Sequence, residues 1–354
     1  MKVLYGIQGT GNGHLSRARK IVPILKEFCE VDTVLSGNQS QVSVDFPIDY
    51  SFNGLSFHAT KKGKVDILNS FLKSQPLDLI RDIRQFPVQQ YDLVISDFEP
   101  ISSWSALLKG VPCVELSHNV AVAHSNSPKP PFNDRKGKFV LTHYCPSELQ
   151  FGFHFKKYTK NTFLPVIRDE VRALETKSEN YFVVYLPAYH DTFIFSILSQ
   201  FDVPWVVFSK YTKTTYQKKN ITFQPIENDS FLAHLAQSQG VLCGAGFELP
   251  AEVLHLGKKL MVIPMKGQYE QWCNAHALKE LGVSMLPKLD ITFHRTIKNW
   301  IQFTPPIHVP FPDTVRHDIQ YVLNEAQSFF FCENRVSKRE RQASVRNIWN
   351  HKFG

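Results

Sequence analysis

Two glycine-rich segments carry the residues of this sequence whose types and spacing could do chemistry. The first, Gly9-Thr10-Gly11-Asn12-Gly13-His14, directly follows an apolar run at 2–7. Glycine permits backbone conformations that other residues avoid and lets the chain approach a bulky anion. A helix expected from about Leu15 to Glu27 would point its N-terminal amides at this loop. The segment predicts a site for an anionic ligand, and a tight turn without a ligand is the alternative.

His14 stands where this loop meets the helix, so its imidazole could act as a general base. The positive end of the helix dipole favours the neutral ring that this role requires. Asp97 and Glu99 follow another apolar run and are rival candidates for the base, because carboxylates in a dry cleft can hold a proton. A capping histidine without chemistry is the alternative for His14.

The second glycine-rich segment is Gly244-Ala245-Gly246, which again follows an apolar run and precedes a helical segment. Glu248 and Glu252 are four residues apart, so both lie on one face of that helix. A carboxylate about one turn into such a helix can bind ribose hydroxyls while the turn meets phosphate. Two exposed glutamates that favour the start of the helix are the alternative.

A polar segment follows the next apolar run, at 260–263. It contains Gln268, Glu270, Gln271 and Asn274, whose amide and carboxylate groups include both donors and acceptors. That chemistry suits the hydroxyl groups of a sugar, with a solvated helix start as the alternative.

Spacing excludes two common phosphate-binding motifs. The dinucleotide fingerprint has glycine at the sixth position, where this chain has His14. A Walker loop ends in Gly-Lys-Ser or Gly-Lys-Thr, and the first loop does not.

The elements that must position these residues alternate between apolar strand-like runs and helical segments. Such alternation predicts parallel sheets built from strand-helix-strand units, with helices on both faces. Strands are expected at Lys2–Ile7, Val31–Ser36, Tyr91–Ser96 and Pro112–Leu116, and the pattern restarts after Pro165 with Tyr181–Leu186, Trp205–Phe208, Gly240–Cys243 and Leu260–Ile263. We predict an α/β protein with two Rossmann-like domains, residues 1–165 and 166–325, followed by a helical segment at 326–354.

Composition limits the function classes. The chain has 354 residues, 43% of them hydrophobic, which excludes a disordered or fibrous protein. No apolar run has the length of a membrane span or a signal peptide, so we expect a soluble cytoplasmic protein. The net charge of +8 suits an anionic small molecule, and the scattered basic residues show no nucleic-acid module. The six cysteines form no metal-binding cluster, and we expect no metal and no cofactor.

In order along the chain, GTGNGH at 9–14, GAGFELPAE at 244–252 and GQYEQWCNA at 267–275 resemble motifs of the GT-B glycosyltransferases. They are most similar to the peptidoglycan-type N-acetylglucosaminyltransferase group and its less characterised relatives. The resemblance implies two domains facing each other across a cleft, with a C-terminal helix packed back on the first. It also implies metal-independent, inverting transfer of a sugar from a UDP-sugar to a hydroxyl acceptor, in the synthesis of a cell-envelope polysaccharide.

The resemblance also implies roles for individual residues. Glu252 would bind the ribose, Glu270 and Gln271 the donor sugar, and the backbone at Ile226 a uracil-like base. His118 and Asn119 would lie on the acceptor side. The implied donor site comprises Gly11, Asn12, Gly13, Ile226, Gly244, Ala245, Gly246, Glu248, Glu252, Gln268, Glu270 and Gln271. The family's phosphate-binding Gly-Gly-Ser loop is replaced here by Pro187-Ala188-Tyr189-His190, so that contact does not carry over unchanged.

Three other functions are compatible, in different degrees, with a Rossmann-like fold and a nucleotide-binding site. A UDP-sugar 2-epimerase shares the donor site but needs no acceptor, and a non-catalytic subunit would bind the nucleotide-sugar without turnover. A nicotinamide-dependent oxidoreductase is disfavoured by the missing glycine. The acceptor could be a sugar or a lipid-linked molecule. The basic tail Arg335–Lys352 could touch the inner face of an anionic membrane, although we favour a solvated packing helix.

Overall fold

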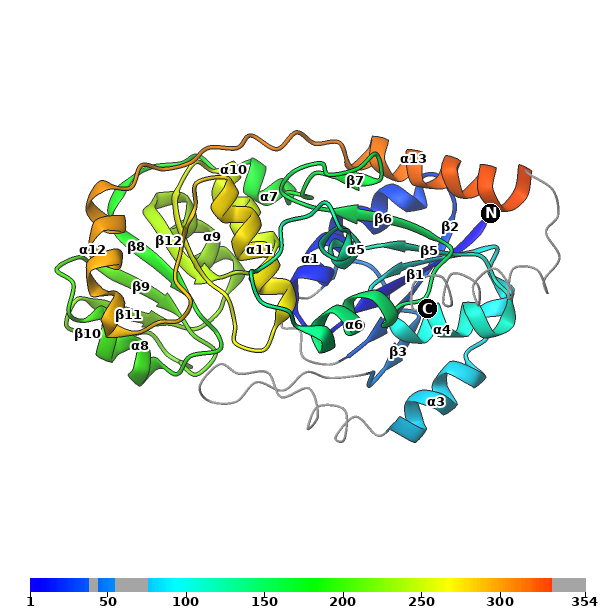
Figure 1. Ribbon diagram of the computed structural model, residues 1–354, viewed down its shortest axis with the longest axis horizontal. Helices are drawn as coiled ribbons and strands as arrows, with labels where there is room; N and C mark the ends of the chain where they lie inside the picture. Colours follow the sequence, from blue (N-terminus) through cyan, green and yellow to red (C-terminus); the bar gives the residue numbers. More distant parts are fainter. Residues whose placement is uncertain (38–43, 55–75, 333–354) are drawn as a thin grey trace.

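The computed structural model describes residues 1–37, 44–54 and 76–332, and its two halves each contain a seven-stranded sheet (Figure 1). The strands of the first sheet are β1 (Lys2–Gln8), β2 (Glu30–Ser36), β3 (Tyr50–Phe52), β4 (Leu93–Asp97), β5 (Cys113–Leu116), β6 (Leu149–Phe153) and β7 (Thr162–Phe163). Their order is β3-β2-β1-β4-β5-β6-β7, so the order reverses direction between β1 and β4. In an open parallel sheet, ligands bind outside the carboxyl ends of strands at such a reversal.

The second half repeats this plan. Its strands are β8 (Glu179–Tyr185), β9 (Trp205–Phe208), β10 (Tyr216–Lys218), β11 (Ile221–Gln224), β12 (Ser238–Gly244), β13 (Lys259–Ile263) and β14 (Ser284–Met285). The order β10-β11-β9-β8-β12-β13-β14 reverses between β8 and β12. The two candidate glycine segments follow β1 and β12, one at each reversal.

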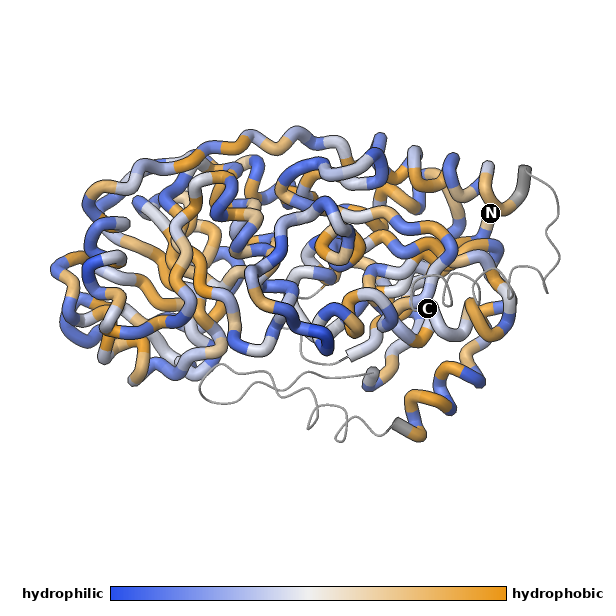
Figure 2. Tube along the Cα trace, in the orientation of Figure 1, coloured by the Kyte–Doolittle hydropathy of each residue, from blue (hydrophilic) through white to orange (hydrophobic). Residues whose placement is uncertain are grey.

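Helices cover the faces of both sheets, as expected. They are α1 (Asn12–Lys26), α3 (Pro76–Gln85), α4 (Pro100–Lys109), α5 (His118–Ala123), α6 (Arg135–His143), α7 (Asp169–Arg172), α8 (Asp191–Leu198), α9 (Asn228–Gln237), α10 (Glu248–His255), α11 (Tyr269–Glu280), α12 (His294–Phe303) and α13 (Val315–Gln327). Short 3-10 turns occupy Val88–Gln90 and Ile291–Phe293, and a π-helical turn occupies Ser328–Cys332. Figure 2 shows the hydrophobic segments concentrated in the strands of both sheets.

The expected α/β fold with two Rossmann-like halves is confirmed, with one correction to the parallel sheets. β10 and β11 pair antiparallel at the edge of the second sheet. Lys219 and Asn220 connect them, and Lys219 has a positive φ of 53°. A two-residue connection with positive φ produces a hairpin, which turns the edge strand round.

The chain returns to the first half through α13. After α12 the segment 304–314 crosses between the halves, and α13 then lies against α1 (Figure 1). Ile319 and Val322 of α13 are buried. Nζ of Lys20 in α1 lies 2.6 Å from Oδ2 of Asp313, just before α13. Residues 315–325, which we assigned to the second domain, therefore form most of a helix on the first, while the limits at 165 and 325 remain predictions.

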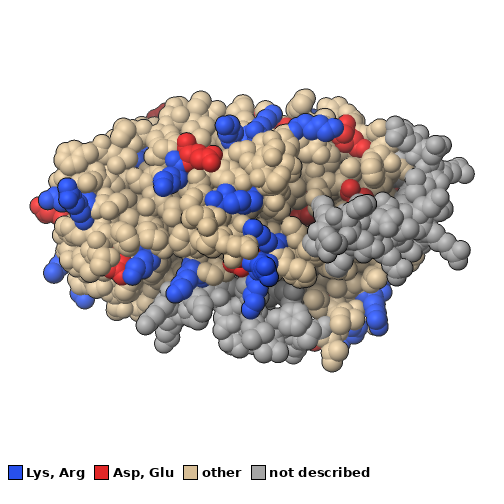
Figure 3. Space-filling view, viewed as in Figure 1, with Lys and Arg blue, Asp and Glu red and all other residues tan. Residues whose placement is uncertain are grey.

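Some expectations fall outside the described residues. They are most of the helical segment at 326–354 and all of the basic tail Arg335–Lys352. On the face shown in Figure 3, Lys and Arg outnumber Asp and Glu, in keeping with the positive net charge. Within the described ranges, no helix is both long and apolar enough to cross a bilayer.

Gly152 of β6 offers a test of the packing in the first half. A Cβ on Gly152 would lie 2.6 Å from the amide nitrogen of Ala121 in α5, a distance that forces the helix away from the strand. We expect Gly152→Ala to lower the free energy of unfolding by about 1–3 kcal/mol, as overpacking does, measured by urea denaturation.

Gly11→Ala is the matched control, because a Cβ at Gly11 meets no described atom within 4 Å and its φ of −157° suits any residue. Equal unfolding free energies for the two variants would contradict the packing argument.

Candidate active site

His14 and Asp97 meet at the carboxyl edge of the first sheet. β1 leads into the loop before α1, whose first turn carries His14, and the neighbouring β4 ends at Asp97. His14 Nδ1 lies 2.9 Å from Asp97 Oδ1. Because the carboxylate can only accept, the proton of this hydrogen bond is on Nδ1, and Nε2 is left as an acceptor. A buried carboxylate that orients an imidazole in this way is typical of general bases.

Arg17 holds Asp97 in place from the same helix. Its Nε donates to Asp97 Oδ2 at 3.0 Å and its Nη2 to Oδ1 at 2.6 Å, and its side chain is only 1% exposed. Burial alone would raise the pKa of Asp97, but the charges of Arg17 and then His14 outweigh burial and hold this pKa below its usual value. Asp97 is therefore a poor proton acceptor and a good partner for a protonated His14.

The backbone after Asp97 is strained. Phe98 has a φ of 58°, a left-handed conformation that is uncommon for a bulky residue. Ser96 stabilises this corner, because its hydroxyl accepts from the amide of Glu99 and donates to its carbonyl, both at 2.9 Å. The Phe98 ring stacks against His14, with 6.5 Å between ring centroids. Strain of this kind persists only where surrounding contacts hold it, often at functional sites.

Glu99, a rival candidate for the base, caps α4 in the structure. Its two carboxylate oxygens accept from the amides of Ile101 and Ser102, each at 2.7 Å, and the Ser36 hydroxyl donates to it as well. Burial raises the pKa of Glu99, and the hydrogen bonds from Ser102 and Ser36 limit that rise. Both oxygens are occupied and the side chain is fully buried, so its geometry is that of a cap which fixes the turn beyond Asp97.

The second half reaches this cluster through Glu248. The Glu248 carboxylate, in the first turn of α10, forms an ion pair with Arg17. A Cβ on Gly13 would overlap that carboxylate, so glycine at this position leaves room for Glu248 as it is placed here. Asn12 adds a hydrogen bond to Tyr185 of β8 across the same boundary.

Glu252, one turn further along α10, is already paired. Arg168 donates from Nε to Oε1 at 2.6 Å and from Nη2 to Oε2 at 3.0 Å. Burial raises the pKa of Glu252, and Arg168 opposes this. Ribose binding by Glu252 remains a prediction, and it would require the hydroxyls to share or displace Arg168.

His118 lies between the halves rather than on an open surface. Its Nδ1 is 2.8 Å from the carbonyl oxygen of Phe153, and its Nε2 is 2.8 Å from Oδ1 of Asn274 in α11. Burial lowers the pKa of His118, against the opposing charge of Glu270, whose Oε1 lies 3.8 Å away. Asn119 follows it in α5 and is also buried. Of the two predicted acceptor-side residues, His118 therefore contacts the second half directly, and Asn119 lies beside it.

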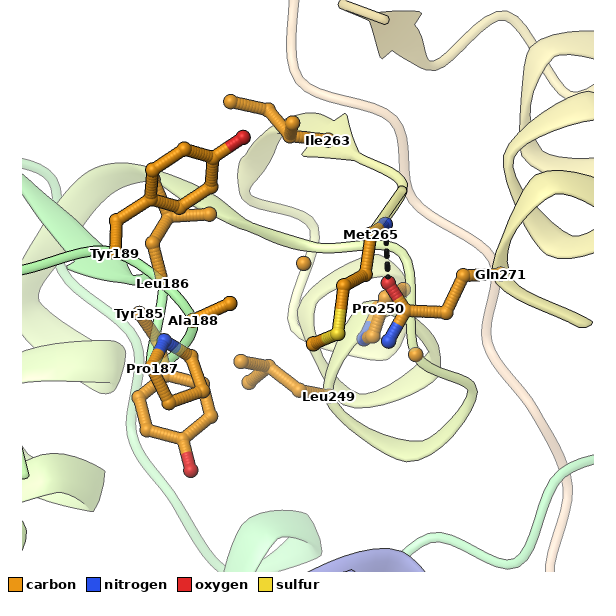
Figure 4. A pocket seen from close by; sticks show the side chains of 12 residues that line it. Tyr185, Leu186, Pro187, Ala188, Tyr189, Leu249, Pro250, Ile263, Met265 and Gln271 are labelled. Carbon is orange, nitrogen blue, oxygen red and sulfur yellow. Dashed lines mark hydrogen bonds between the residues drawn. The ribbon is translucent and has the colours of Figure 1, made fainter. Parts of the chain in front are cut away.

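A cavity of about 130 Å³ opens at the carboxyl ends of β8, β12 and β13 (Figure 4). Its lining is mainly apolar and consists of Tyr185, Leu186, Pro187, Ala188, Tyr189, Gly244, Gly246, Leu249, Pro250, Ile263, Met265 and Gln271. Gln271 Oε1 accepts from the amide of Met265 at 2.9 Å, which engages the oxygen of this side-chain amide and fixes the orientation of its Nε2. A cavity near 150 Å³ holds one six-membered ring.

The loop after β8 offers little to a phosphate. Pro187 has no amide hydrogen, and the amide of Tyr189 donates to the carbonyl of Leu186 at 2.9 Å. His190 caps α8, and Asp191 begins it with a carboxylate that accepts from Thr212 at 2.7 Å. Where the resemblance implies a Gly-Gly-Ser loop with amides that bind phosphate, this chain therefore has a loop that leads into α8, whose first turn is capped by His190 and carries the acidic Asp191.

The structure brings some predicted residues together and separates others. His14, Asp97, Gly13 and Glu248 form one cluster around Arg17, while Gly244, Gly246 and Gln271 line the cavity. Ala245 is buried and its carbonyl accepts from Asn274, Gln268 precedes α11, and Ile226 lies in the loop between β11 and α9. None of those three is among the described residues that line the cavity.

Sequence reasoning missed Arg17, Arg168 and the apolar character of the cavity. The role of Arg17 could have been predicted from the sequence, because Arg17 follows His14 by three residues and therefore lies on the same face of the helix. Arg168 lies near the connection between the halves, where no helix or strand pattern indicates its partner.

Comparisons with known proteins now bear on this geometry. The sequence model described as glycosyl transferase family 1 matches residues 1–305. No curated protein is a significant match to the sequence.

Several solved structures are similar over nearly the whole chain. Phytolacca americana UGT2, complexed with UDP-2fluoro-glucose and pterostilbene, has a TM-score of 0.53 and 12% identity, with 99% of each chain covered. Arabidopsis thaliana UGT89C1, complexed with UDP, has a TM-score of 0.53 and 11% identity, covering 98% of this chain and 99% of that one. SnogD from Streptomyces nogalater has a TM-score of 0.50 and 13% identity, with the same coverage. At these identities the likeness shows a shared fold, the two-domain GT-B arrangement.

Asp97→Asn tests the buried pair. The native carboxylate has a lowered pKa, so its stabilisation is present above the unfolded value near pH 4 and is lost as the pH falls through the folded pKa. We expect the substitution to cost about 3 kcal/mol of unfolding free energy at pH 7, measured by urea titration.

This difference between the native protein and Asp97→Asn should shrink below about pH 4, because the carboxylate of the unfolded chain takes up a proton there, whereas the native carboxylate, with its lowered pKa, does so only at a lower pH. A difference that is equal at pH 7 and at pH 3 would show that the ionised pair is not its source.

Proposed function

We propose that this chain, which belongs to glycosyl transferase family 1, transfers a sugar from a UDP-sugar to a hydroxyl acceptor, with inversion and without a metal ion. The chain is a glycosyltransferase by its family, and the donor, acceptor and stereochemistry are the proposal. The observation that carries it is the His14–Asp97 pair beside the cavity of the second half. Tyr185 of the cavity hydrogen-bonds Asn12, two residues before His14, so the two features are neighbours.

His14 is the base in this proposal. Its Nε2 takes the proton of the acceptor hydroxyl while the acceptor oxygen attacks the anomeric carbon of the donor. The bond from that carbon to the diphosphate oxygen breaks, and the nucleoside diphosphate leaves with the electron pair. Asp97 stabilises the imidazolium that forms. Attack opposite the leaving group inverts the anomeric centre.

The second half supplies the donor site. The amide of Ala245 donates to the carbonyl of Ile263 and Pro250 has no amide hydrogen, so the donors here are the backbone amides at Gly246 and at the first residues of α10. These amides can stabilise the negative charge of the departing diphosphate. The cavity has the size of one ring, and Gln271 Nε2 can donate to a hydroxyl of the donor. UDP in one similar structure and a UDP-sugar in another support a uridine donor.

The acceptor is the second substrate of the proposed reaction. A sugar or a lipid-linked molecule in cell-envelope polysaccharide synthesis follows from the sequence motifs. A cytoplasmic enzyme with peripheral contact at the inner face of the membrane would fit a lipid-linked acceptor. One similar structure contains pterostilbene, which is a phenol. Phenols should therefore be tested as acceptors as well.

A thermal-shift panel of UDP-, GDP- and dTDP-sugars would identify the donor, because binding raises stability by RT ln(1 + [L]/Kd). The donor that binds would then be incubated alone and with sugars, phenols and lipid-linked alcohols. Epimer formed from the donor alone would indicate a 2-epimerase. Binding without turnover on any acceptor would indicate a non-catalytic subunit, and either result would contradict the proposal.

His14→Ala is expected to lower kcat about 10²–10⁴-fold while donor affinity, measured by calorimetry, stays unchanged. His317→Ala is the control, since its side chain is 84% exposed on α13. Full activity of His14→Ala would show that another group takes the proton.

Leu249→Trp is expected to fill the cavity. The KM for the donor should rise about tenfold or more, because about 1.4 kcal/mol of lost binding corresponds to a factor of ten. Leu108→Trp, at a side chain 54% exposed on α4, is the control. An unchanged KM in Leu249→Trp would place the donor elsewhere.

A further inference from the structure

We propose that Glu248 acts through Arg17 as a positioning residue that makes the His14–Asp97 pair an effective base only when the two halves are closed on each other. This inference rests on the proposed role of His14 as the base. It concerns Arg17 and Glu248 as a connection between the halves, beyond any contact with the donor.

Arg17 is placed to connect the two halves. It lies one turn after His14 on α1, and its Nε and Nη2 are both used by Asp97. Its remaining terminal nitrogen, Nη1, donates to Glu248 of α10. Arg17 Nη2 is also 3.1 Å from His14 Nδ1, so any movement of the guanidinium alters the surroundings of the imidazole.

Glu248 is suited to make and break this contact. Its side chain is 22% exposed, whereas those of Arg17 and Asp97 are 1% and 0% exposed. Gly13 lets the carboxylate reach Arg17, because a side chain there would overlap it. Arg17 and Asp97 belong to the first half and Glu248 to the second, so separating the halves removes Glu248 alone.

The charges of the cluster explain why this contact matters. Asp97, Arg17 and Glu248 sum to −1 while His14 is neutral, so protonating His14 brings the cluster to zero. Without Glu248 the cluster would start at zero and become positive in a buried setting, which opposes proton uptake. Glu248 therefore favours transfer of the acceptor's proton to His14.

Other titratable groups around the cluster do not replace this charge. Tyr5 of β1 faces Asp97 and Arg17, and burial, followed by the charge of Asp97, keeps its hydroxyl protonated by raising its pKa. Glu99 at the start of α4 is engaged with backbone amides and Ser36. Phe98, which stacks on His14, is apolar.

If His14 becomes an effective base only when the two halves are closed, the donor is protected from hydrolysis. A UDP-sugar bound in an open site is exposed to water, which can accept the sugar in place of the acceptor. If the base is weak until the halves close, hydrolysis is slow in the open state. The contact between Arg17 and Glu248 would then favour transfer over hydrolysis.

Glu248→Gln tests the inference, because it removes the charge and keeps the size of a partly exposed side chain. Ring resonances of His14 would be followed by NMR against pH, with His14→Gln used for assignment. We expect the titration midpoint to fall by about one pH unit, the effect of one lost charge nearby. In turnover with the UDP-sugar, the acid limb of the pH profile should move the same way and the plateau should fall about tenfold.

Arg17→Lys is the second variant, because it keeps the positive charge but cannot bridge two carboxylates with a planar fork. We expect a loss of kcat similar to that of Glu248→Gln, without the downward shift of the acid limb. Glu280→Gln, at the far end of α11, controls for loss of a charge alone and should match the native protein in both measurements.

The outcomes separate the two proposals. An unchanged His14 midpoint and an unchanged plateau in Glu248→Gln, with His14→Ala inactive, would overturn this inference and leave the proposed function intact. A loss of thermal stability and kcat in Glu248→Gln with no shift of the acid limb would show a merely structural role and also overturn it. An active His14→Ala would instead overturn the proposed function, while the NMR titration would still report whether Glu248 acts on His14.

Discussion

The buried charge of Arg17 is the constraint on which the arrangement of the site depends. A guanidinium removed from water must meet acceptors on its donor groups, and here two carboxylates from different halves provide them. Three other features hold the two carboxylates in position around the guanidinium. Gly13 leaves room for Glu248, the strained corner at Phe98 directs Asp97, and the Glu99 cap holds that corner. The position of the imidazole follows from these contacts.

The sequence was sufficient to predict the repeated pattern of the fold. Apolar runs of strand length, each followed by a helical segment, located β1, β4, β8, β12 and β13 within two residues at either end. Shorter elements such as α5, α7 and β14 escaped, because fewer than about seven residues show no clear period. The contact of α13 with the first half was not foreseen, because its sequence pattern shows an apolar face but not which half it covers.

The candidate site was predictable where it depends on one sheet and unpredictable where it depends on the contact between halves. His14 and Asp97 follow neighbouring strands, so their approach could be anticipated from the carboxyl edge of a parallel sheet. The partners of Glu248 and Glu252 lie 231 and 84 residues away, and no local pattern encodes them. Glu99 is different: we expected a candidate base, although Pro100 directly after it is a common first residue of a helix and could have indicated the cap that the structure shows.

The return of the chain through α13 has a consequence for how the halves can move. Among the described residues, two separate segments, 164–178 and 304–314, join the halves. Buried aliphatic side chains anchor α13 on α1, and Lys20 of α1 pairs with Asp313 at the end of the second segment. A pair of bodies joined at two points resists sliding and twisting, and swings most freely about the line through both points. Opening should therefore follow a single arc, along which Glu248 withdraws from Arg17 by the same route that it returns.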